Sequence, residues 1–388
     1  MMDHRMGSYL DNAATSFPKP EAVHEAVLAA MREIGASPGR GGYGQALAAS
    51  RLLMTVRESL AGLINASDPA RLIFTHNATA ALNQAVFGLL SPGDHVVTST
   101  MEHNSLLRPL RLLEKSGVAI SMVSADSHGL LNPETVRQAI CPATRMIAIS
   151  HVSNVTGGIQ PVAAIAAIAK AAGSLLLLDT AQSVGVIPLD MQETGIDLLA
   201  APGHKGLMGP QGTGFLAVAP GVVLRPLLAG GTGSSSDQDL QPDDFPEGFE
   251  AGTHNLPGIA GLGAAVAFVK ETGVQRIGRH EHDLAEYLRE RLARLPGIRL
   301  YGPVDLLQRT GVLSLTIEGT DPSELAFFLD KSYGIAVRSG LHCAPHAHRT
   351  IGTWPAGTLR ISPGWFSTMQ EMDYLCEALT AIIQKGHS

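Results

Sequence analysis

The sequence predicts an α/β protein with a mostly parallel β-sheet and a smaller α+β region toward its C-terminus. Short apolar runs alternate with longer helical segments through the middle of the chain, and such alternation places helices on both faces of a parallel sheet. The pattern changes after residues 230–255, a segment rich in Gly, Ser, Pro and Asp. A chain of 388 residues is also long enough for two substructures and a large core.

The elements of the first part follow from local hydrophobic pattern. Strands are predicted from short apolar runs, over residues 71–75, 95–100, 145–150, 174–179 and 213–218. Helices are predicted between them, over residues 79–90, 105–115 and 162–172. No fixed-period repeat is visible in the sequence.

After residue 255 the pattern changes to α+β. The predicted elements are a long helical region, a strand, a helix, a second strand and a closing amphipathic helix, over residues 259–295, 311–317, from 321, 334–338 and 369–383. The start of the helix at 321 is well marked, because Asp321, Pro322 and Glu324 take the N-cap, N1 and N3 positions of a capping box.

The composition favours a protein that buries much of itself or covers an apolar face with a partner subunit. Charged residues make up 16% of the chain, against roughly 25% in ordinary domains, and the mean hydropathy is +0.14. The net charge of −7 and the lack of a basic run argue against nucleic acid as a partner. Residues 1–8 contain no apolar signal-peptide core, and no stretch approaches the ~18 apolar residues of a membrane span. Three cysteines without paired spacing fit a reducing cytosol.

A lysine among small residues is the most informative feature of the chain. Lys205 lies in Pro202-Gly-His-Lys-Gly206, where glycines on both sides remove side chains that would block the approach of a cofactor. Asp179 ends the apolar run that begins at Ser174, and open α/β sheets put their sites at such carboxyl ends. Singly, a surface lysine and a turn-forming or capping aspartate are the ordinary interpretations. Together they suit pyridoxal phosphate, which needs a lysine for its Schiff base and an acid that keeps the pyridine nitrogen protonated.

Three other segments predict further parts of a site. Residues 75–83 turn a strand into a helix, and the free N–H groups of a helix N-terminus bind phosphate; a simple N-cap at Thr79 predicts the same local sequence. Arg360 is suited to hold a carboxylate through two parallel hydrogen bonds, and a solvated arginine at a strand end is the alternative. His103 directly follows a strand, either as a structural hydrogen-bonding residue or as a residue of the site.

Cys343 differs from the other two cysteines in its surroundings. It follows a strand and a glycine in Val337-Arg-Ser-Gly-Leu-His-Cys-Ala344, with histidines at 342, 346 and 348. Imidazoles and an arginine nearby favour the thiolate, which is the nucleophile. A metal site is the alternative interpretation, but Pro345 and the loop setting give no standard ligand spacing. Cys376 falls on the apolar face of the closing helix, and Cys141 has no cluster around it.

These motifs carry a resemblance to a known family. The sequence resembles the class V aminotransferases among the fold-type I pyridoxal enzymes, and within them the short-loop, group II cysteine desulfurases. The resemblance runs from Tyr9-Leu-Asp-Asn-Ala-Ala-Thr15 to Arg360-Ile-Ser-Pro-Gly-Trp-Phe366, nearly the whole chain. Arg338-x-Gly-x-His-Cys343 matches the short-loop motif, and the few residues between Cys343 and Arg360 fit a short catalytic loop.

The resemblance implies a role for each matching residue. Lys205 would carry the cofactor, His103 would stack on its ring and move protons, and Cys343 would take up sulfur; these are the implied catalytic residues. The implied cofactor-binding residues are Ala78, Thr79, His103, Asn154, Asp179, Gln182, His204, Lys205 and, from the neighbouring subunit, Thr253. The implied substrate-binding residues are Asn154, Arg360, Arg338 and Tyr43. No metal is implied.

The fold implied by the resemblance is the fold type I of pyridoxal-phosphate-dependent transferases. A mostly parallel, seven-stranded-type sheet would form a large domain over residues 16–255. A small α+β domain over residues 256–388, joined by the 1–15 arm, would carry the cysteine loop.

Two positions depart from the family pattern. Pro202 stands where the family usually has Ser or Thr, so one phosphate contact is missing or replaced. Tyr43, in Gly39-Arg-Gly-Gly-Tyr43, stands where many group II members have a histidine near the substrate.

The implied activity is that of a cysteine desulfurase, which converts L-cysteine to L-alanine and leaves a persulfide on Cys343. A selenocysteine lyase uses the same parts. An aminotransferase or a kynureninase-like hydrolase is less expected, because neither needs a nucleophilic cysteine. The implied partners are a second subunit, which borrows the loop at residues 230–255, and a sulfur-acceptor protein or thiol. The expected compartment is the cytoplasm, and iron–sulfur cluster assembly is a pathway that uses such sulfur.

Two function classes without this chemistry fit the sequence less well. A nicotinamide-binding dehydrogenase needs Gly-x-Gly-x-x-Gly between a first strand and helix, and Gly209-Pro-Gln-Gly-Thr-Gly214 lacks that spacing and setting. A non-catalytic persulfide carrier has no use for Lys205, Asp179 and Arg360 together.

Overall fold

The computed structural model describes residues 7–39, 41–233 and 237–386. Residues 1–6 of the expected arm, residue 40 of the segment before Tyr43 and residues 234–236 of the expected loop lie outside the described residues, as do residues 387–388.

The main structural unit is a seven-stranded sheet with the strand order β1-β7-β6-β5-β4-β2-β3. Its strands are β1 Leu72–Thr75, β2 His95–Ser99, β3 Ala119–Val123, β4 Thr144–Ser150, β5 Leu175–Asp179, β6 Leu198–Pro202 and β7 Gly214–Val218. Neighbours from β3 to β6 are parallel, and β7 is antiparallel to both β1 and β6. The predicted mostly parallel sheet is therefore confirmed.

Helices cover both faces of this sheet, so its central strands are buried on both sides. In β4, Met146 and Ala148 belong to the core shared with α3 and α4, whereas Ile147 and Ile149 belong to the core shared with α2, α6 and α8. This alternation is the period of two that a strand imposes. The covering helices are α2 Gly44–Leu63, α3 Ala78–Leu89, α4 Asn104–Lys115, α6 Val162–Ala171 and α8 Leu256–Thr272.

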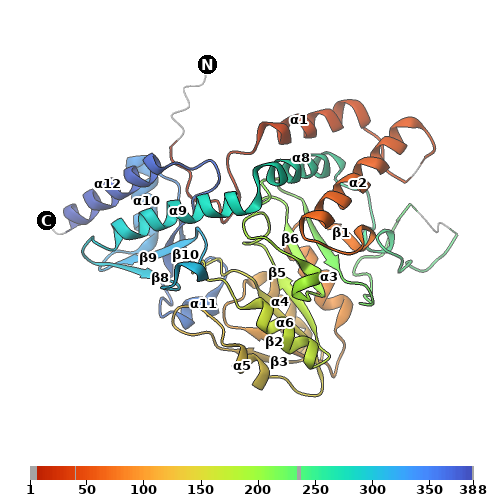
Figure 1. Ribbon diagram of the computed structural model, residues 1–388, viewed down its shortest axis with the longest axis horizontal. Helices are drawn as coiled ribbons and strands as arrows, with labels where there is room; N and C mark the ends of the chain where they lie inside the picture. The colour runs from red at the N-terminus through yellow and green to blue at the C-terminus, as the bar shows by residue number, and fades with distance from the viewer. Residues whose placement is uncertain (1–6, 40, 234–236, 387–388) are drawn as a thin grey trace.

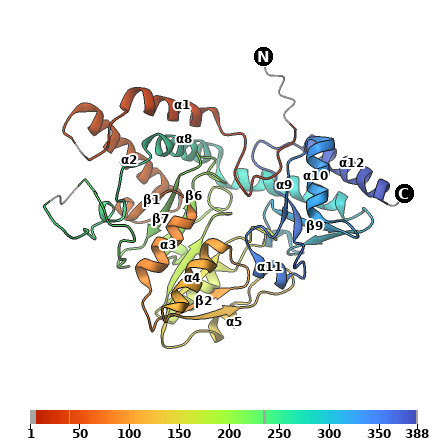
Figure 2. The same ribbon diagram turned by 180° about the vertical axis from the view of Figure 1, so that it is seen from behind.

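A second sheet of four antiparallel strands, in the order β10-β11-β9-β8, lies toward the C-terminus. Its strands are β8 Ile298–Tyr301, β9 Leu313–Ile317, β10 Arg338–Gly340 and β11 Thr358–Ile361. The helices α9 Val274–Leu292, α10 Pro322–Tyr333 and α12 Met369–Gly386 pack with it. Figures 1 and 2 place this region at the opposite end of the molecule from α1 Glu21–Ala29 and α2.

Several sequence predictions need correction. The helical region predicted over 259–295 is two helices, α8 and α9, which part at Gly273, where φ is 92°. The strand predicted over 334–338 is wrong, because Gly334 ends α10 with φ of 66° and β10 begins only at Arg338. Strand β3 went unpredicted, because it is an edge strand whose residues are mostly half-exposed and lack a buried run.

Other local predictions are confirmed. The Asp321 side chain accepts hydrogen bonds from the N–H groups of Ser323 and Glu324 at 2.7 and 3.3 Å, as expected of an N-cap. The predicted strands and helices before residue 219 match β1, β2, β4, β5, β7, α3, α4 and α6 to within a residue or two. The remaining short helices are α5 Pro133–Gln138, α7 Met191–Thr194 and α11 Pro345–Thr350.

The division into two domains stays a prediction. By packing, α8 lies in the core of the large sheet, with Ile259 and Leu262 buried there. Leu10 of the arm is fully buried in the core of the small sheet. Among the described helices, none has the length and apolar character to cross a membrane.

Candidate active site

Most of the predicted site residues line one cavity of about 240 Å³ between the two sheets. The cavity opens at the carboxyl ends of β4, β5 and β6, and β10 and β11 form its other wall. The predicted residues that line it are Ala78, Thr79, His103, Asn154, Asp179, Gln182, His204, Lys205, Arg338 and Arg360. Residues from both sheets and from distant parts of the chain thus meet where open α/β sheets place their sites.

Lys205 and Asp179 form the charged centre of the cavity. Asp179 is the last residue of β5 and is 3% exposed, and its Oδ1 accepts a hydrogen bond from the Ala181 N–H at 2.9 Å. Burial raises the pKa of Asp179, while that hydrogen bond and Lys205 oppose the rise. Burial lowers the pKa of Lys205 to about 8, and Asp179 partly offsets the lowering. The amine is therefore poised to gain or lose a proton near neutral pH.

The glycines beside Lys205 have a packing reason that the sequence did not reveal. A Cβ at Gly203 would lie 2.2 Å from Thr213 Oγ1, and one at Gly206 would lie 2.5 Å from the Val184 carbonyl oxygen. These contacts come from the protein itself, so the glycines allow the loop after β6 to pack closely on its neighbours. Lys205 is positioned by that packing.

The N-terminus of α3 lines the cavity, and the N–H groups of a helix N-terminus are suited to an anion. Asn77, not Thr79, is the N-cap residue, because Asn77 Oδ1 accepts from the Ala80 N–H at 2.9 Å. Ala78 and Thr79 remain on the cavity wall at the positive end of the helix dipole. His204 lies beside them with its Nδ1 buried and without a partner, and burial lowers its pKa to about 4.

His103 is held as a neutral imidazole. It is the N-cap residue of α4, and its Nδ1 accepts from the Ser105 N–H at 3.0 Å. Nδ1 is therefore unprotonated and the ring proton sits on Nε2. Burial, reinforced by Lys205 and nearby arginines, lowers its pKa to about 4.

A buried acid behind the cavity was missed by sequence reasoning. Glu102 is 1% exposed and accepts hydrogen bonds from Ser99 Oγ and from the N–H and Oγ of Ser150, the latter two at 2.7 Å. Ser150 is paired in the sheet with Asp179. Burial foremost, with a contribution from Asp179, raises the pKa of Glu102 to about 7. Its position directly before His103 was the available signal.

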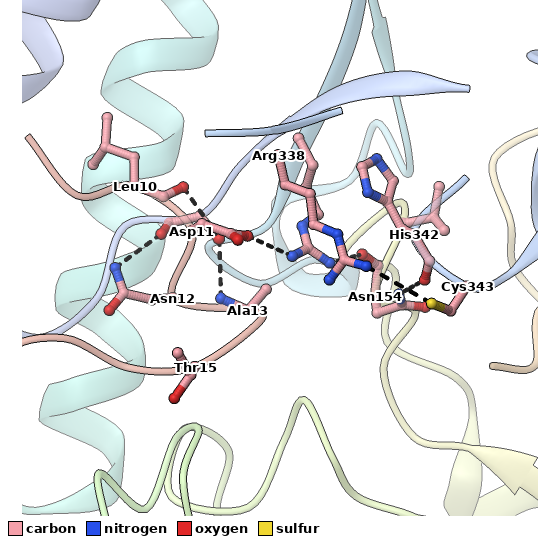
Figure 3. Close-up of polar contacts among 12 residues, drawn as sticks. Leu10, Asp11, Asn12, Ala13, Thr15, Asn154, Arg338, His342 and Cys343 are labelled. Carbon is pink, nitrogen blue, oxygen red and sulfur yellow. Dashed lines mark hydrogen bonds and ion pairs between the residues drawn. The ribbon is translucent and has the colours of Figure 1, made fainter. Parts of the chain in front are cut away.

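Arg360 is held by two hydrogen bonds to other segments. It is 1% exposed on β11; its Nη2 donates to Asp11 Oδ1 at 2.6 Å and its Nη1 to the Asn154 carbonyl at 3.1 Å. Its Nε is buried without a partner. Asp11 lies in the motif at residues 9–15, to which the sequence reasoning gave no individual role. Figure 3 shows this part of the arm beside Arg338 and Asn154.

Cys343 is exposed at the tip of a turn next to the cavity. Both His342 and Cys343 have positive φ, 47° and 60°, a conformation that non-glycine residues adopt only where the surroundings hold it. Here Asn104 N–H donates to the Cys343 carbonyl at 2.8 Å and Asn154 Nδ2 to the His342 carbonyl at 2.7 Å. The amide of Asn154 is thus engaged with the cysteine turn (Figure 3).

The histidines near Cys343 do not act as the sequence predicted. Burial lowers the pKa of His342 to about 2 and that of His348 to about 4, so both are neutral and supply no positive charge. The charged neighbour is Arg338, whose Nη2 donates to Cys343 Sγ at 3.7 Å. Within the described residues, no group of three or more His, Cys, Asp or Glu side chains is arranged to hold a metal ion.

Two predicted site residues lie elsewhere. Tyr43 is 54% exposed at the start of α2 and is absent from the cavity wall. Thr253 lines a separate cavity of about 110 Å³ near the N-terminus of α8. Pro202 ends β6 on the wall of the Lys205 cavity, where it offers no side-chain donor.

Comparison with known proteins agrees with this geometry. The family model for class-V aminotransferases matches residues 8–375. A probable cysteine desulfurase of Methanothermobacter thermautotrophicus is 38% identical, over 97% of this chain and 95% of that protein. A cysteine desulfurase of Salmonella agona is 35% identical, over 97% of this chain and 93% of that protein.

Solved structures of similar proteins give the same fold. The apo structure of a cysteine desulfurase from Thermococcus onnurineus has a TM-score of 0.90 and 32% identity, covering 98% of this chain and 95% of that chain. A cysteine desulfurase from Escherichia coli, in an S-sulfonic acid form, has a TM-score of 0.87 and 30% identity, with coverage of 98% and 95%.

Proposed function

Because the chain belongs to the class-V aminotransferase family, we propose that it is a pyridoxal-phosphate-dependent cysteine desulfurase. One observation carries the proposal. A single cavity brings together a half-buried lysine, a buried aspartate and a buried arginine, and an exposed cysteine lies beside it, in contact with Arg338. An aminotransferase needs the cavity but not the cysteine.

The cavity fits the proposed cofactor. The start of α3 and the unpartnered, buried Nδ1 of His204 suit a phosphate group. The buried carboxylate of Asp179 suits the ring nitrogen, and the neutral imidazole of His103 suits a stacked ring. When bound, pyridoxal phosphate would supply an electron sink for the substrate Cα.

The residues around that position have distinct tasks in the proposed reaction. Arg360 would hold the α-carboxylate of L-cysteine, and its burial strengthens that hydrogen bonding. Lys205, with its pKa lowered to about 8, would take the α-proton and return a proton to the carbon skeleton. His103 would carry its ring proton on Nε2, because Nδ1 accepts from the Ser105 N–H.

Cys343 would accept the sulfur. Its thiolate attacks the substrate sulfur, so an S–S bond forms as the substrate Cβ–S bond breaks. The electron pair of the broken bond stays with Cβ, which takes up a proton. L-cysteine and the Cys343 thiol thus give L-alanine and a Cys343 persulfide, and Arg338 stabilises negative charge on the sulfur.

The wider setting follows from the same proposal. We propose a homodimer in which each site receives Thr253 from the partner's loop, because Thr253 lies away from the Lys205 cavity of its own chain. The persulfide would pass to an acceptor protein or thiol, and the expected compartment is the cytoplasm. Iron–sulfur cluster assembly is the process we propose for this sulfur.

The test is the Cys343→Ala variant. Production of sulfide and alanine from L-cysteine should fall by about 100-fold or more, as for other nucleophiles removed from a catalytic unit. Cofactor content and the spectral response to L-cysteine should remain, because Lys205, Asp179 and Arg360 are untouched. Selenocysteine turnover should fall less, since the weaker C–Se bond breaks more readily. Near-normal desulfuration by the variant would contradict the proposal and favour an aminotransferase or lyase.

A further inference from the structure

The N-terminal arm contacts Arg360, the buried arginine that lines the cavity. The backbone of Asp11 forms an isolated parallel β-bridge with that of Ser362, and Asn12 N–H donates to the Ser362 carbonyl at 3.1 Å. Ala13 N–H donates to Ser362 Oγ at 3.0 Å. The backbone of the arm is therefore docked along the chain just after Arg360, and this docking places Asp11 within hydrogen-bonding distance of the Arg360 guanidinium.

Arg360 has a hydrogen-bonding pattern that leaves one edge available. Nη2 donates to Asp11 Oδ1 at 2.6 Å and Nη1 to the Asn154 carbonyl at 3.1 Å. Nε is buried without a partner, and Nη2 carries a second N–H. Nε and Nη2 together form the side of the guanidinium that pairs bidentately with a carboxylate.

Asp11 places a negative charge beside two neighbouring arginines, of which it binds Arg360. Arg338 and Arg360 face each other in register across β10 and β11, so two cations adjoin at the cavity wall. Arg360 is 1% exposed, so bulk water cannot accept hydrogen bonds from its guanidinium or fix its orientation. A buried guanidinium without its carboxylate partner is costly and loses its fixed orientation.

Resting on the proposed function, we propose that Asp11 is a positioning residue for substrate recognition. Its carboxylate holds Nη2 of Arg360 so that the Nε edge faces the α-carboxylate of the amino acid. The arm thereby sets the geometry of substrate binding without touching the reacting atoms. The opposite role would be competition, in which Asp11 occupies Arg360 until the substrate displaces it.

Two substitutions at Asp11 separate these roles. Asp11→Asn keeps an oxygen that can accept from Nη2 but removes the charge, whereas Asp11→Ala removes both. Positioning predicts that Asp11→Ala weakens binding of L-alanine to the holoenzyme by about tenfold or more, and that Asp11→Asn stays within about threefold of wild type. In L-cysteine turnover the loss should appear mainly in KM, with little change in kcat.

The measurement is calorimetric titration of the holoenzyme with L-alanine and with L-alaninamide, which lacks the carboxylate. L-alaninamide affinity should be the same in wild type and Asp11→Ala. Tyr9→Phe is the matched control, because Tyr9 OH donates to the backbone carbonyls of Thr15 and Asp11 at 2.9 and 3.3 Å and not to the Asp11 carboxylate; it should leave L-alanine affinity unchanged. If Asp11→Ala does not fold, Asp11→Ser replaces it, since its hydroxyl is too short to reach Nη2.

Several results would overturn the inference. Tighter L-alanine binding in both Asp11 variants would establish competition. Equal weakening of L-alanine and L-alaninamide, or equal weakening by Tyr9→Phe, would establish a general structural role of the arm. In these cases the wild type still binds L-alanine and the proposed function stands. A cofactor-loaded wild type that binds neither L-alanine nor L-cysteine would contradict the proposed function and the inference with it.

Discussion

The two walls of the Lys205 cavity are built by different means. The large-sheet wall, formed by Asp179, Lys205 and His103, sits on the ends of buried parallel strands and on the loops that follow them. The small-sheet wall, formed by Arg338 and Arg360, sits on two short antiparallel strands, and Cys343 lies beside it on an exposed turn with positive φ. The first wall is held by backbone packing, and the second by side-chain bonds to other segments.

The electrostatics of the two walls differ in the same way. On the large-sheet wall, burial lowers the pKa values of His103 and Lys205 and raises that of Asp179, so it disfavours the charged form of each group. On the small-sheet wall, burial lowers the pKa of Arg360 and Asp11 opposes that lowering, while Arg338 contacts Cys343 Sγ. In the proposed reaction, the large-sheet wall would therefore supply the proton-transfer group and the small-sheet wall would bind the anionic group of the substrate.

The largest effect is expected on the large-sheet wall. Lys205→Ala should abolish covalent attachment of the cofactor, measured by borohydride reduction, and all turnover, because Lys205 is the only lysine among the described residues that line the cavity. Lys19→Ala is the matched control. Lys19 also has its pKa lowered to about 8 by burial, but it donates to Ser16 Oγ and the His204 carbonyl outside the cavity. If the cofactor can still be fixed covalently to the Lys205→Ala variant, another lysine must carry it and the assignment of Lys205 is wrong.

The difference between the walls also explains what the sequence revealed. Asp179, Lys205 and the strands beneath them were predictable, because buried parallel strands are continuous apolar runs and their polar ends stand out. Asp11 could not be assigned a role, because its contact with Arg360 joins opposite ends of the chain. The neutral state of His342 was also out of reach, since it depends on burial beneath a turn and not on spacing.

The second prediction concerns the acid behind the large-sheet wall. The pKa of Glu102 is raised from 4.5 to about 7, so the folded state favours the protonated acid. Protonation of Glu102 therefore adds about 3 kcal/mol to the free energy of unfolding. This stabilisation is fully present below about pH 4.5 and is lost as the pH rises through 7. In Glu102→Gln this loss is absent. Denaturant unfolding should therefore show the stability difference moving in favour of Glu102→Gln between about pH 5 and pH 8. A difference that does not depend on pH would mean that Glu102 is ionised throughout.

The smallest effects come from a matched pair of glycines, one on each wall. In Gly206→Ala the new Cβ would lie 2.5 Å from the Val184 carbonyl oxygen, so backbone beside Lys205 must shift, at a cost of about 2 kcal/mol. In Gly340→Ala nothing lies within 4 Å of the new Cβ, but φ is 97°, and the strained backbone costs about 1 kcal/mol. Thermal unfolding measures both costs.

The two glycine substitutions should affect different steps, because each lies beside a different wall of the cavity. Gly206→Ala should weaken cofactor binding, because the shift falls on the segment that carries Lys205. Gly340→Ala should leave cofactor affinity unchanged and slow sulfur transfer, because Gly340 ends β10 just before the Cys343 turn. Cofactor titration and single-turnover sulfide release distinguish the two. Equal loss of cofactor affinity in both variants would show that the walls respond as one unit, because a strain confined to β10 has no direct contact with the cofactor end of the cavity.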